Sequence, residues 1–517
     1  MAFMMSTTPG IPPSPSPPTL SQPQPPASLP VRTIPGTYGW PLLGPISDRL
    51  DYFWFQGPET FFKKRTEKYK STVFRTNVPP SFPLFVNVNP NVIAVLDCKS
   101  FSYMFDMELV EKKNVLVGDF MPSVKFTGNL RTCAYLDTSE PQHSQIKNFA
   151  MDILKRSSMT WVPELTANLS TFFDTIEADV SKDGSASYLI PLQKSMFKFL
   201  TKCLVGADPA SSPKIAKSGY AMLDRWLALQ LLPTVKIGVL QPLEEILLHS
   251  FAYPSFLVSG DYNQLYQFIE EHGKEVVKRG ETDFGLTKEV TIHNLLFVLG
   301  FNAYGKEVVK RGETDFGLTK EVTIHNLLFI LGFNAYGGFS VFLPSLIGKI
   351  ASDTTGLQAK IVKEVRENAG STLSFDSVKN LQLVQSVVYE ALRLNPPVPL
   401  QFARARKDFQ LSSHDSAFDI KKGELLCGFQ QQVMRDEKVF DEPDTFKPDR
   451  FMKNKELLNY LYWSNGPQTG SPSESNKQCA AKDSVTLTAT LLVAYVFQRY
   501  DSITGSGTSI TALEKAK

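Results

Sequence analysis

Cys479 stands where a polar loop meets a long apolar segment, and this position suits chemistry. The loop belongs to WSNGPQTGSPSESNKQCAAKD, residues 463–483, and the apolar periodicity of residues 480–500 predicts a helix after it. A sulfur at a helix N-terminus meets free N–H groups and the positive end of the dipole, which favour a thiolate, and Lys477 adds positive charge. Such a thiolate is a nucleophile or a soft metal ligand. A buried cysteine with no chemical role is the alternative.

Three charged residues upstream predict a buried ion cluster. Glu390 and Arg393 in VVYEALRLNPP share one face of a helix that should end at the proline pair, and Arg450 follows in FKPDRF. A carboxylate bound by two guanidinium groups is a strong and geometrically specific arrangement. Glu390 and Arg393 alone would fit a solvated helical salt bridge better. The order of ExxR, PxRF and then the cysteine is what favours the buried cluster.

Long amphipathic patterns must position these residues. Helices are expected at residues 144–156, 189–204, 221–231, 262–277 and 357–367. Residues 71–97 alternate apolar and polar side chains between Pro and Asn breaks, which predicts a small β-sheet, and more strand is expected near residues 402–426. The fold class indicated is mainly α with a small β-sheet region.

An uncharged stretch, residues 326–348, predicts a buried central helix. A transmembrane helix is the alternative, but Asn334, Gly337, Gly338 and Pro344 interrupt the run. A glycine inside a helix costs about 1 kcal/mol relative to alanine. The glycine pair is best explained by something flat that lies close to the backbone.

Residues 273–304 recur as residues 305–336 with one change, Val298 to Ile330. Near-identity indicates a recent duplication or an error in gene prediction, because a solenoid needs three or more diverged units. Both copies carry the same apolar run, and one groove can hold only one of them. Exposing the other would cost on the order of 10 kcal/mol, about the net stability of a domain. We expect the spare copy to bulge out and destabilise the fold, or to be absent from the natural protein.

The first 30 residues differ from the rest of the chain. They are rich in Pro, Ser, Thr and Gln, and no acidic residue precedes Asp48, so they cannot bury enough apolar surface to fold. This composition suits a plastid transit peptide, although arginine is scarce; a disordered tail is the alternative. No N-terminal apolar run is long enough for a membrane anchor.

Composition excludes several functions. A net charge of +2 gives no reason to expect nucleic acid as a partner. The five cysteines are scattered and lack CxxC spacing, which argues against a disulfide framework and for a reducing compartment. The six histidines do not cluster with cysteines, which argues against a zinc site.

EALR, KPDRF and the Cys479 segment together resemble the three signatures of the haem-thiolate cytochrome P-450 superfamily. The resemblance implies a P-450 fold over residues 31–517 and one haem b. It also implies that Glu390, Arg393 and Arg450 lock the core behind the haem, and that Cys479 is the axial thiolate ligand of the iron. The sequence departs from the ordinary pattern in two places. The cysteine segment is longer than Phe-x-x-Gly-x-Arg-x-Cys-x-Gly, and FNAYGGFS replaces the Gly-x-Asp/Glu-Thr turn that delivers protons to dioxygen.

Both departures resemble one branch, the plant fatty-acid-hydroperoxide enzymes: allene oxide synthase, divinyl ether synthase and hydroperoxide lyase. The resemblance runs from about Leu29 to the C-terminus and includes IPGTYGWPLLGP, YLDTSEPQH and KKGELLCGF. Ala481, where many relatives have Gly, and the duplication depart from it. Without one 32-residue copy the chain of 517 residues would have 485, a normal length for the branch.

Four residues match positions that resemble haem-propionate partners in this branch: Lys112, His143, Lys147 and Lys477. Cations near the two carboxylates of haem are physically sensible. For the first three, a solvated surface charge is the alternative.

The missing acid–Thr relay makes the site ill-suited to cleaving dioxygen with electrons from a reductase, so we expect no reductase partner. A hydroperoxide brings its own weak O–O bond, and thiolate ligation helps to cleave it. Neutral Asn334 would hydrogen-bond the peroxide oxygens without supplying a proton. Asn302 in the first copy lacks the following glycine pair, so we expect Asn334 to line the site. A capped, buried asparagine is the alternative.

Two positions separate the activities of the branch. Allene oxide synthases tend to carry Phe where this chain has Leu116, and Ser where it has Ala335. A Phe ring would steady a carbon radical until it is oxidised to a cation. Leu116 and Ala335 remove that help and favour recombination to a hemiacetal, which falls apart into two aldehydes. That both residues only pack the pocket is the alternative.

The resemblance therefore predicts cleavage of a 13-hydroperoxide of linolenic or linoleic acid into a six-carbon aldehyde and a 12-oxo acid, in the plastid, without O2 or NADPH. Allene oxide or divinyl ether synthesis is the first rival, and a conventional monooxygenase is the second. A haem-poor, inactive protein bound to membrane or lipid bodies is the third. Peripheral membrane contact, oligomeric state and the preference for 13- over 9-hydroperoxides are left open.

Overall fold

The computed structural model describes residues 29–80, 85, 88–129, 131–236, 238, 243–272 and 336–517. The expected transit peptide lies outside these ranges, apart from its last two residues. Both copies of the duplicated segment lie outside them as well, apart from Tyr336.

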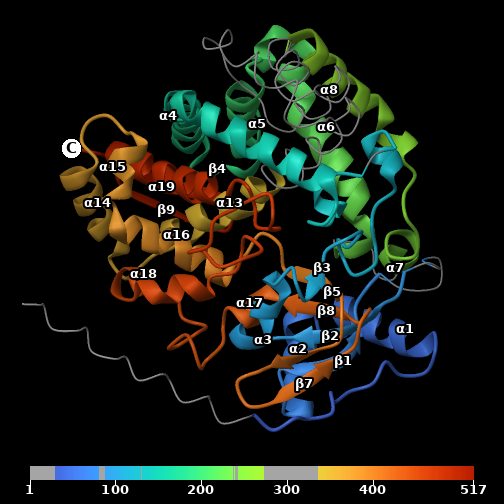
Figure 1. The fold of residues 1–517 in the computed structure, drawn as a ribbon. Helices are drawn as coiled ribbons and strands as arrows, with labels where there is room; N and C mark the ends of the chain where they lie inside the picture. Colours follow the sequence, from blue (N-terminus) through green and yellow to red (C-terminus); the bar gives the residue numbers. More distant parts are fainter. Residues whose placement is uncertain are drawn as a thin grey trace, which may run out of the picture.

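Helices make up most of the described chain, and the expected fold class is confirmed (Figure 1). The helices are α1 (Leu43–Leu50), α2 (Pro58–Tyr69), α3 (Cys98–Ser102), α4 (Pro141–Asp183), α5 (Leu189–Val205), α6 (Pro213–Leu231), α7 (Leu243–Leu247), α8 (Ser259–His272), α13 (Gly337–Ala351), α14 (Leu357–Asn368), α15 (Phe375–Lys379), α16 (Gln382–Leu394), α17 (Gln430–Val433), α18 (Arg450–Lys453) and α19 (Lys482–Arg499).

Amphipathic periodicity located most of the long helices. α5, α14 and α19 agree with the expected ranges within two residues at each end. α4 is far longer than the expected residues 144–156, because it continues through Pro163. Its ends follow local chemistry: Pro141 occupies the first turn, and Gly184 ends the helix in the left-handed conformation at φ 74°.

The largest sheet has five strands in the order β1-β2-β8-β5-β3. Its members are β1 (Val73–Asn77), β2 (Asn91–Val95), β3 (Val110–Glu111), β5 (Leu400–Ala405) and β8 (Leu425–Phe429). β2 and β8 pair in parallel with Ile93 opposite Leu426, and the other pairs are antiparallel. Strands were expected near residues 71–97 and 402–426, and the structure pairs these two distant segments in one sheet, a pairing that the local sequence patterns did not predict.

Two smaller sheets complete the β structure of the described residues. One has the order β4-β10-β9, and the other pairs β6 with β7. Their strands are β4 (Ala186–Ser187), β6 (Phe409–Ser412), β7 (Ala417–Ile420), β9 (Tyr500–Ser506) and β10 (Ser509–Lys515).

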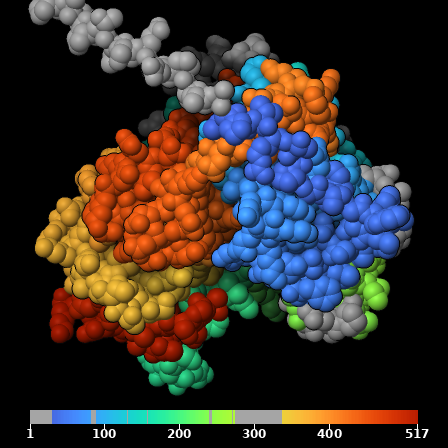
Figure 2. Space-filling model, turned by 90° about the horizontal axis from the view of Figure 1, so that it is seen from below, coloured from blue at the N-terminus to red at the C-terminus, as the bar shows by residue number. Residues whose placement is uncertain are grey.

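The N-terminal part of the described chain is joined to strands from its second half. Figure 2 shows N-terminal residues in blue beside orange residues from the second half of the chain on one face. The backbone N–H of Arg32 donates to the carbonyl of Ala417 at 2.9 Å, and Arg75 pairs with Glu424 at 3.3 Å. α16 and α19 lie in the main core, and Trp161 of α4 donates to Thr488 of α19 at 2.7 Å.

None of the helices in the described ranges combines the length and apolarity that crossing a bilayer requires. α13, which contains the described part of the expected central helix, includes Pro344 and buries most of its apolar side chains.

Candidate functional site

Residues 463–481, which we name the cysteine loop, lead into α19 without regular secondary structure apart from one bridge between Trp463 and Gly466. Cys479 lies three residues before the helix and is half-buried. Its backbone N–H donates to the carbonyl of Ser464 at 2.8 Å, and its carbonyl accepts from the N–H of Lys482 at 3.1 Å. The sulfur therefore stands at the start of a helix, as its sequence context predicted.

The electrostatic expectation for this sulfur is wrong for the protein alone. Burial raises the pKa of the Cys479 thiol, and this outweighs the lowering by the N–H of Ala481 and by the charge of Lys147. The thiol thus stays protonated until a metal cation takes the sulfur, because coordination deprotonates a thiol outright. Of the two roles open to it, metal ligand fits this environment better than free nucleophile.

Four nitrogen-bearing side chains, one of them within the cysteine loop, connect this loop to other parts of the chain. We name Lys112, His143, Lys147 and Lys477 the nitrogen cluster. Their contacts are Lys112 Nζ to Asn465 Oδ1, His143 Nδ1 to the Glu474 carbonyl (3.1 Å), Lys147 Nζ to the carbonyls of Asn476 (3.2 Å) and Gln478, and Lys477 Nζ to the carbonyls of Cys133 (2.7 Å) and Leu136 (2.7 Å). Lys112, His143 and Lys147 are at most 5% exposed, so the alternative of solvated surface charges is wrong.

No direct ion pair among the described residues balances the charge of the nitrogen cluster. Burial, followed by the charge of Lys477, lowers the pKa of Lys112 to about 7, and burial lowers the pKa of Lys477 to about 8. None of the three lysines forms an ion pair with a carboxylate of the described residues. His143 Nε2 is buried and has no hydrogen-bond partner there. Unpaired buried cations are costly, so this arrangement suits an anionic ligand beside the cysteine.

The predicted ion cluster of Glu390, Arg393 and Arg450 is formed. Arg393 binds both carboxylate oxygens of Glu390 at 2.7 and 2.8 Å, and Arg450 Nε lies 3.1 Å from each. All three side chains are buried, which excludes the solvated salt bridge. The remaining guanidinium N–H groups donate to backbone carbonyls between residues 434 and 445. This cluster joins α16 to α18 and has no open position for a ligand.

The substrate-side residues are described only in part. Leu116 is half-buried in the loop after β3 and packs against the main core. Asn334 and Ala335 lie outside the described residues, directly before Tyr336 and α13.

Sequence reasoning missed two amide side chains, Asn465 and Gln478, that cross the cysteine loop. Asn465 Nδ2 donates to the carbonyl of Lys477 at 2.8 Å, and Gln478 Nε2 donates to the carbonyl of Pro467 at 2.7 Å. The only available signal was the presence of amides in a Gly/Pro/Ser-rich loop, where backbone carbonyls need side-chain donors.

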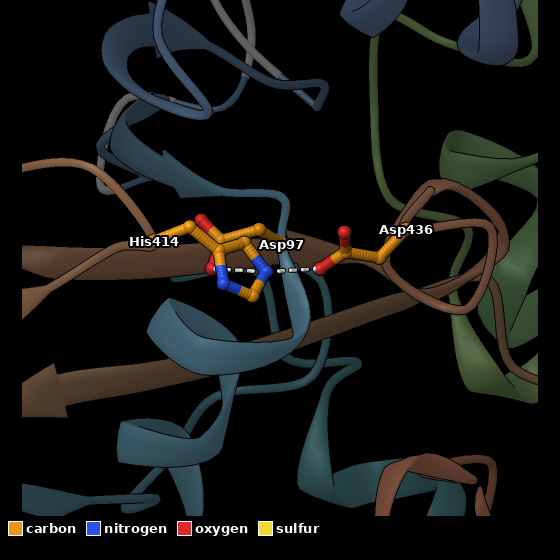
Figure 3. Close-up of side chains that lie close together, drawn as sticks. All are labelled: Asp97, His414 and Asp436. Atoms are coloured by element: carbon orange, nitrogen blue, oxygen red, sulfur yellow. Dashed lines mark hydrogen bonds and ion pairs between the residues drawn. The ribbon is translucent and has the colours of Figure 1, made fainter. Parts of the chain in front are cut away.

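A second group of ligand-type side chains consists of Asp97, His414 and Asp436 (Figure 3). His414 Nε2 is 2.7 Å from Asp436 Oδ2 and 3.9 Å from Asp97 Oδ1. Every carboxylate oxygen already accepts from a hydroxyl, a backbone N–H or the imidazole, and Asp97 caps α3. The group is therefore a structural tie between segments, in which each carboxylate oxygen already accepts at least one hydrogen bond.

The residues around Cys479 fit a haem. A haem carries two carboxylates and a metal ion. The carboxylates match the nitrogen cluster, whose positive charge is not balanced by ion pairs and whose His143 Nε2 has no hydrogen-bond partner among the described residues, and the metal ion matches the soft sulfur ligand. The carboxylates would supply the negative charge that the buried lysines lack.

Comparison with known proteins agrees with this geometry. Residues 352–468 match the family described as Cytochrome P450, and the match ends before Cys479. The chain is 62% identical over 497 residues to "Fatty acid hydroperoxide lyase, chloroplastic" of Solanum lycopersicum, covering 95% of this chain and 98% of that protein. It is 58% identical over 519 residues to "Linolenate hydroperoxide lyase, chloroplastic" of Arabidopsis thaliana, covering 99% of each. It is 37% identical over 512 residues to "Allene oxide synthase, chloroplastic" of Linum usitatissimum, covering 96% of this chain and 89% of that protein.

Similarity to the lyases is thus much higher than similarity to the allene oxide synthase, and both extend over nearly the whole chain. The chain belongs to the fatty acid hydroperoxide lyases of the cytochrome P450 superfamily, whose cofactor is a haem iron.

Proposed function

We propose that this enzyme cleaves 13-hydroperoxides of linolenic and linoleic acid into a six-carbon aldehyde and a 12-oxo acid, without O2, NADPH or a reductase. The observation that carries the proposal is that the buried side chains of Lys112, His143 and Lys147 contact the loop of Cys479, which itself contains Lys477. The names of the two lyase relatives support the substrate class.

In this proposal the chain binds haem b through the iron and through the two carboxylates. Cys479 would supply the thiolate ligand, and the three lysines of the nitrogen cluster would bind the two carboxylates. His143 Nε2 would add a donor only as a doubly protonated ring, because its Nδ1–H already donates to the carbonyl of Glu474. Lys112 and Lys477 regain full positive charge there, because an adjacent carboxylate raises a lysine pKa. Bound haem supplies the one-electron chemistry that cleaves the O–O bond of the hydroperoxide.

Residues on the substrate side direct the outcome. The amide of Asn334 orients the hydroperoxide oxygens and supplies no proton, since an amide is not an acid at neutral pH. Leu116 and Ala335 offer neither an aromatic ring nor a hydroxyl to a carbon radical or cation. This favours return of the oxygen cleaved from the hydroperoxide to the carbon radical, which gives a hemiacetal isomeric with the substrate. Breakdown of the hemiacetal to two carbonyl products is then favoured over proton loss to an allene oxide.

The domain plan belongs to the same proposal. Residues 31–517 form the haem domain and residues 1–30 serve as a plastid transit peptide, which the chloroplastic names of both lyases support. Contact with plastid membranes would be peripheral.

Product analysis tests the function. Purified protein is incubated with linolenic acid 13-hydroperoxide without NADPH, and products are identified by gas chromatography–mass spectrometry. Hexenal is the expected product, and Cys479→Ser should abolish it. Ketols or cyclopentenones would instead establish allene oxide synthesis and show that Leu116 and Ala335 do not set the outcome.

Deletion of one copy of the duplicated segment provides a second part of this test. A variant without residues 273–304 has a chain of 485 residues with one copy of the segment. If the full chain is inactive and this variant makes hexenal, the spare copy causes the loss of activity and the haem site is intact. If both are inactive despite bound haem, the proposed activity is wrong.

A further inference from the structure

The cysteine loop has almost no regular secondary structure, so other contacts must fix the sulfur of Cys479. Its first arm, residues 464–468, lies against its second arm, residues 476–479. One backbone hydrogen bond joins the arms at the cysteine itself, from the Cys479 N–H to the carbonyl of Ser464 at 2.8 Å. A single bond of this kind leaves the orientation of the arm free, and additional links are therefore needed.

Gln478 supplies one link from the second arm to the first. Its side chain is 4% exposed, and its Nε2 donates to the carbonyl of Pro467 at 2.7 Å and to Ser464 Oγ at 3.1 Å. A Cβ at Gly466 would lie 3.0 Å from both Cδ and Nε2 of Gln478, so the amide fills the inside of the turn. The turn is closed around this side chain.

Asn465 supplies the opposite link, from the first arm to the second. Its Nδ2 donates to the carbonyl of Lys477 at 2.8 Å, and its Oδ1 accepts from Lys112 Nζ. Asn465 has φ 63°, in the left-handed region that asparagine tolerates better than most residues. The link therefore depends on this residue type for both its donor and its backbone conformation.

We propose that Asn465 and Gln478 are positioning residues that hold the Cys479 sulfur for thiolate ligation of the haem iron. The two amides cross between the arms in opposite directions and bracket the Ser464–Cys479 backbone bond. This inference rests on the proposed role of Cys479 as the axial ligand. Neither amide touches substrate; each acts through the loop. Side chains that orient a metal ligand in this way commonly change metal affinity or activity by about 10- to 100-fold when they are replaced.

The test uses Gln478→Met, which keeps the length of the side chain and removes both donors. A second variant, Asn465→Asp, tolerates the left-handed conformation and still accepts from Lys112, but it cannot donate to the carbonyl of Lys477. Thr469→Val is the matched control, because Thr469 is exposed in the same loop and bonds only outward to Asn459 at 2.7 Å. Each haem-bound protein is isolated by size exclusion, reduced and exposed to carbon monoxide.

The readout is the fraction of ferrous–carbonyl complex that shows the red-shifted Soret band of thiolate-ligated haem, with unfolding temperature measured in parallel. We expect the ratio of thiolate-ligated to non-thiolate complex to fall about tenfold or more in Gln478→Met, less in Asn465→Asp, and not at all in Thr469→Val. If both amide variants keep the wild-type ratio, whether or not their unfolding temperature falls, the amides are only structural and the inference is wrong. Absence of the band from the wild-type protein would instead refute thiolate ligation by Cys479, a separate failure of the proposed function.

Discussion

Two clusters of basic side chains in the described part of the chain differ in how their charge is balanced. In the ion cluster, Glu390 binds Arg393 and Arg450, and the remaining guanidinium donors reach backbone carbonyls. In the nitrogen cluster, none of the three lysines forms an ion pair with a carboxylate of the described residues, and the pKa of Lys112 and that of Lys477 are lowered. The first cluster is complete without a ligand, and the second is not.

This difference separates structural charge from functional charge. A satisfied buried cluster adds to stability or specificity of the fold, whereas an unbalanced one is tolerated where a ligand later supplies the missing charge. Variants of the two clusters should therefore affect the apoprotein and the haem complex in different ways.

The largest effect should come from Glu390→Gln. It leaves two buried guanidinium groups without their carboxylate, and breaking such a pair costs about 3–5 kcal/mol. We expect the free energy of unfolding to fall by this amount with and without haem, as measured by urea denaturation. Glu367→Gln, in an exposed i,i+4 pair with Lys363 on α14, is the control and should leave stability unchanged. Equal stability of Glu390→Gln and wild type would contradict the structural role.

Lys112→Met should have a large effect of another kind. Removing a buried, uncompensated charge should leave the apoprotein as stable as wild type or more stable. The same change removes a cation from the haem carboxylates, so haem affinity should fall about tenfold or more. Urea denaturation and haem titration of the apoprotein measure the two effects. A loss of apoprotein stability together with the loss of haem affinity would show that Lys112 has a structural role like that of the ion cluster.

The pH dependence of the apoprotein should report the same lysine. Burial, with the charge of Lys477, holds the pKa of folded Lys112 at about 7, below its ordinary value of 10.5. Between these values the unfolded chain binds more protons, so stability should rise as pH increases from about 7 toward about 10. Urea denaturation at several pH values should show this slope in wild type, a shallower slope in Lys112→Met, and little slope in the haem complex. A slope that Lys112→Met leaves unchanged would assign it to other groups.

The smallest effect is expected for His143→Phe. Burial, followed by the charges of Lys477 and Lys147, lowers the pKa of His143 to about 3, so its ring is neutral at neutral pH. Because its Nδ1–H donates to the Glu474 carbonyl, Nε2 of the neutral ring is an acceptor and gives a haem carboxylate no hydrogen bond. The loss of haem affinity should therefore stay below about fivefold, which corresponds to one neutral hydrogen bond of about 1 kcal/mol. Haem titration of both proteins checks this value. A loss as large as that of Lys112→Met would mean that the ring is charged in the complex.

The sequence allowed good prediction of features that depend on local pattern. Amphipathic spacing located α5 and α14 almost to the residue, and the order of Glu390, Arg393, Arg450 and Cys479 indicated the superfamily. The length of α4 was underestimated: the expected helix stopped at residue 156, whereas α4 continues to Asp183 through Pro163, a residue type that usually ends a helix.

Features that depend on burial were beyond local pattern. Lys112, His143 and Lys147 carry the same letters whether they lie on the surface or in the interior, and only the fold shows that they are buried. The pKa of Cys479 was mispredicted for the same reason, because the helix start is local and the burial that outweighs it is not. Asn465 and Gln478 became visible only when the arms of the cysteine loop were seen to face each other.

The most direct measurement titrates apoprotein with haem and with haem dimethyl ester, in which both carboxylates are uncharged, for wild type and Lys112→Met. If the nitrogen cluster binds the carboxylates, esterification should weaken binding to wild type about tenfold or more, and it should weaken binding to Lys112→Met clearly less, since the partner charge is already gone. Equal binding of haem and its ester by the wild-type protein would contradict the account, because the buried lysines would then have no part in holding the cofactor.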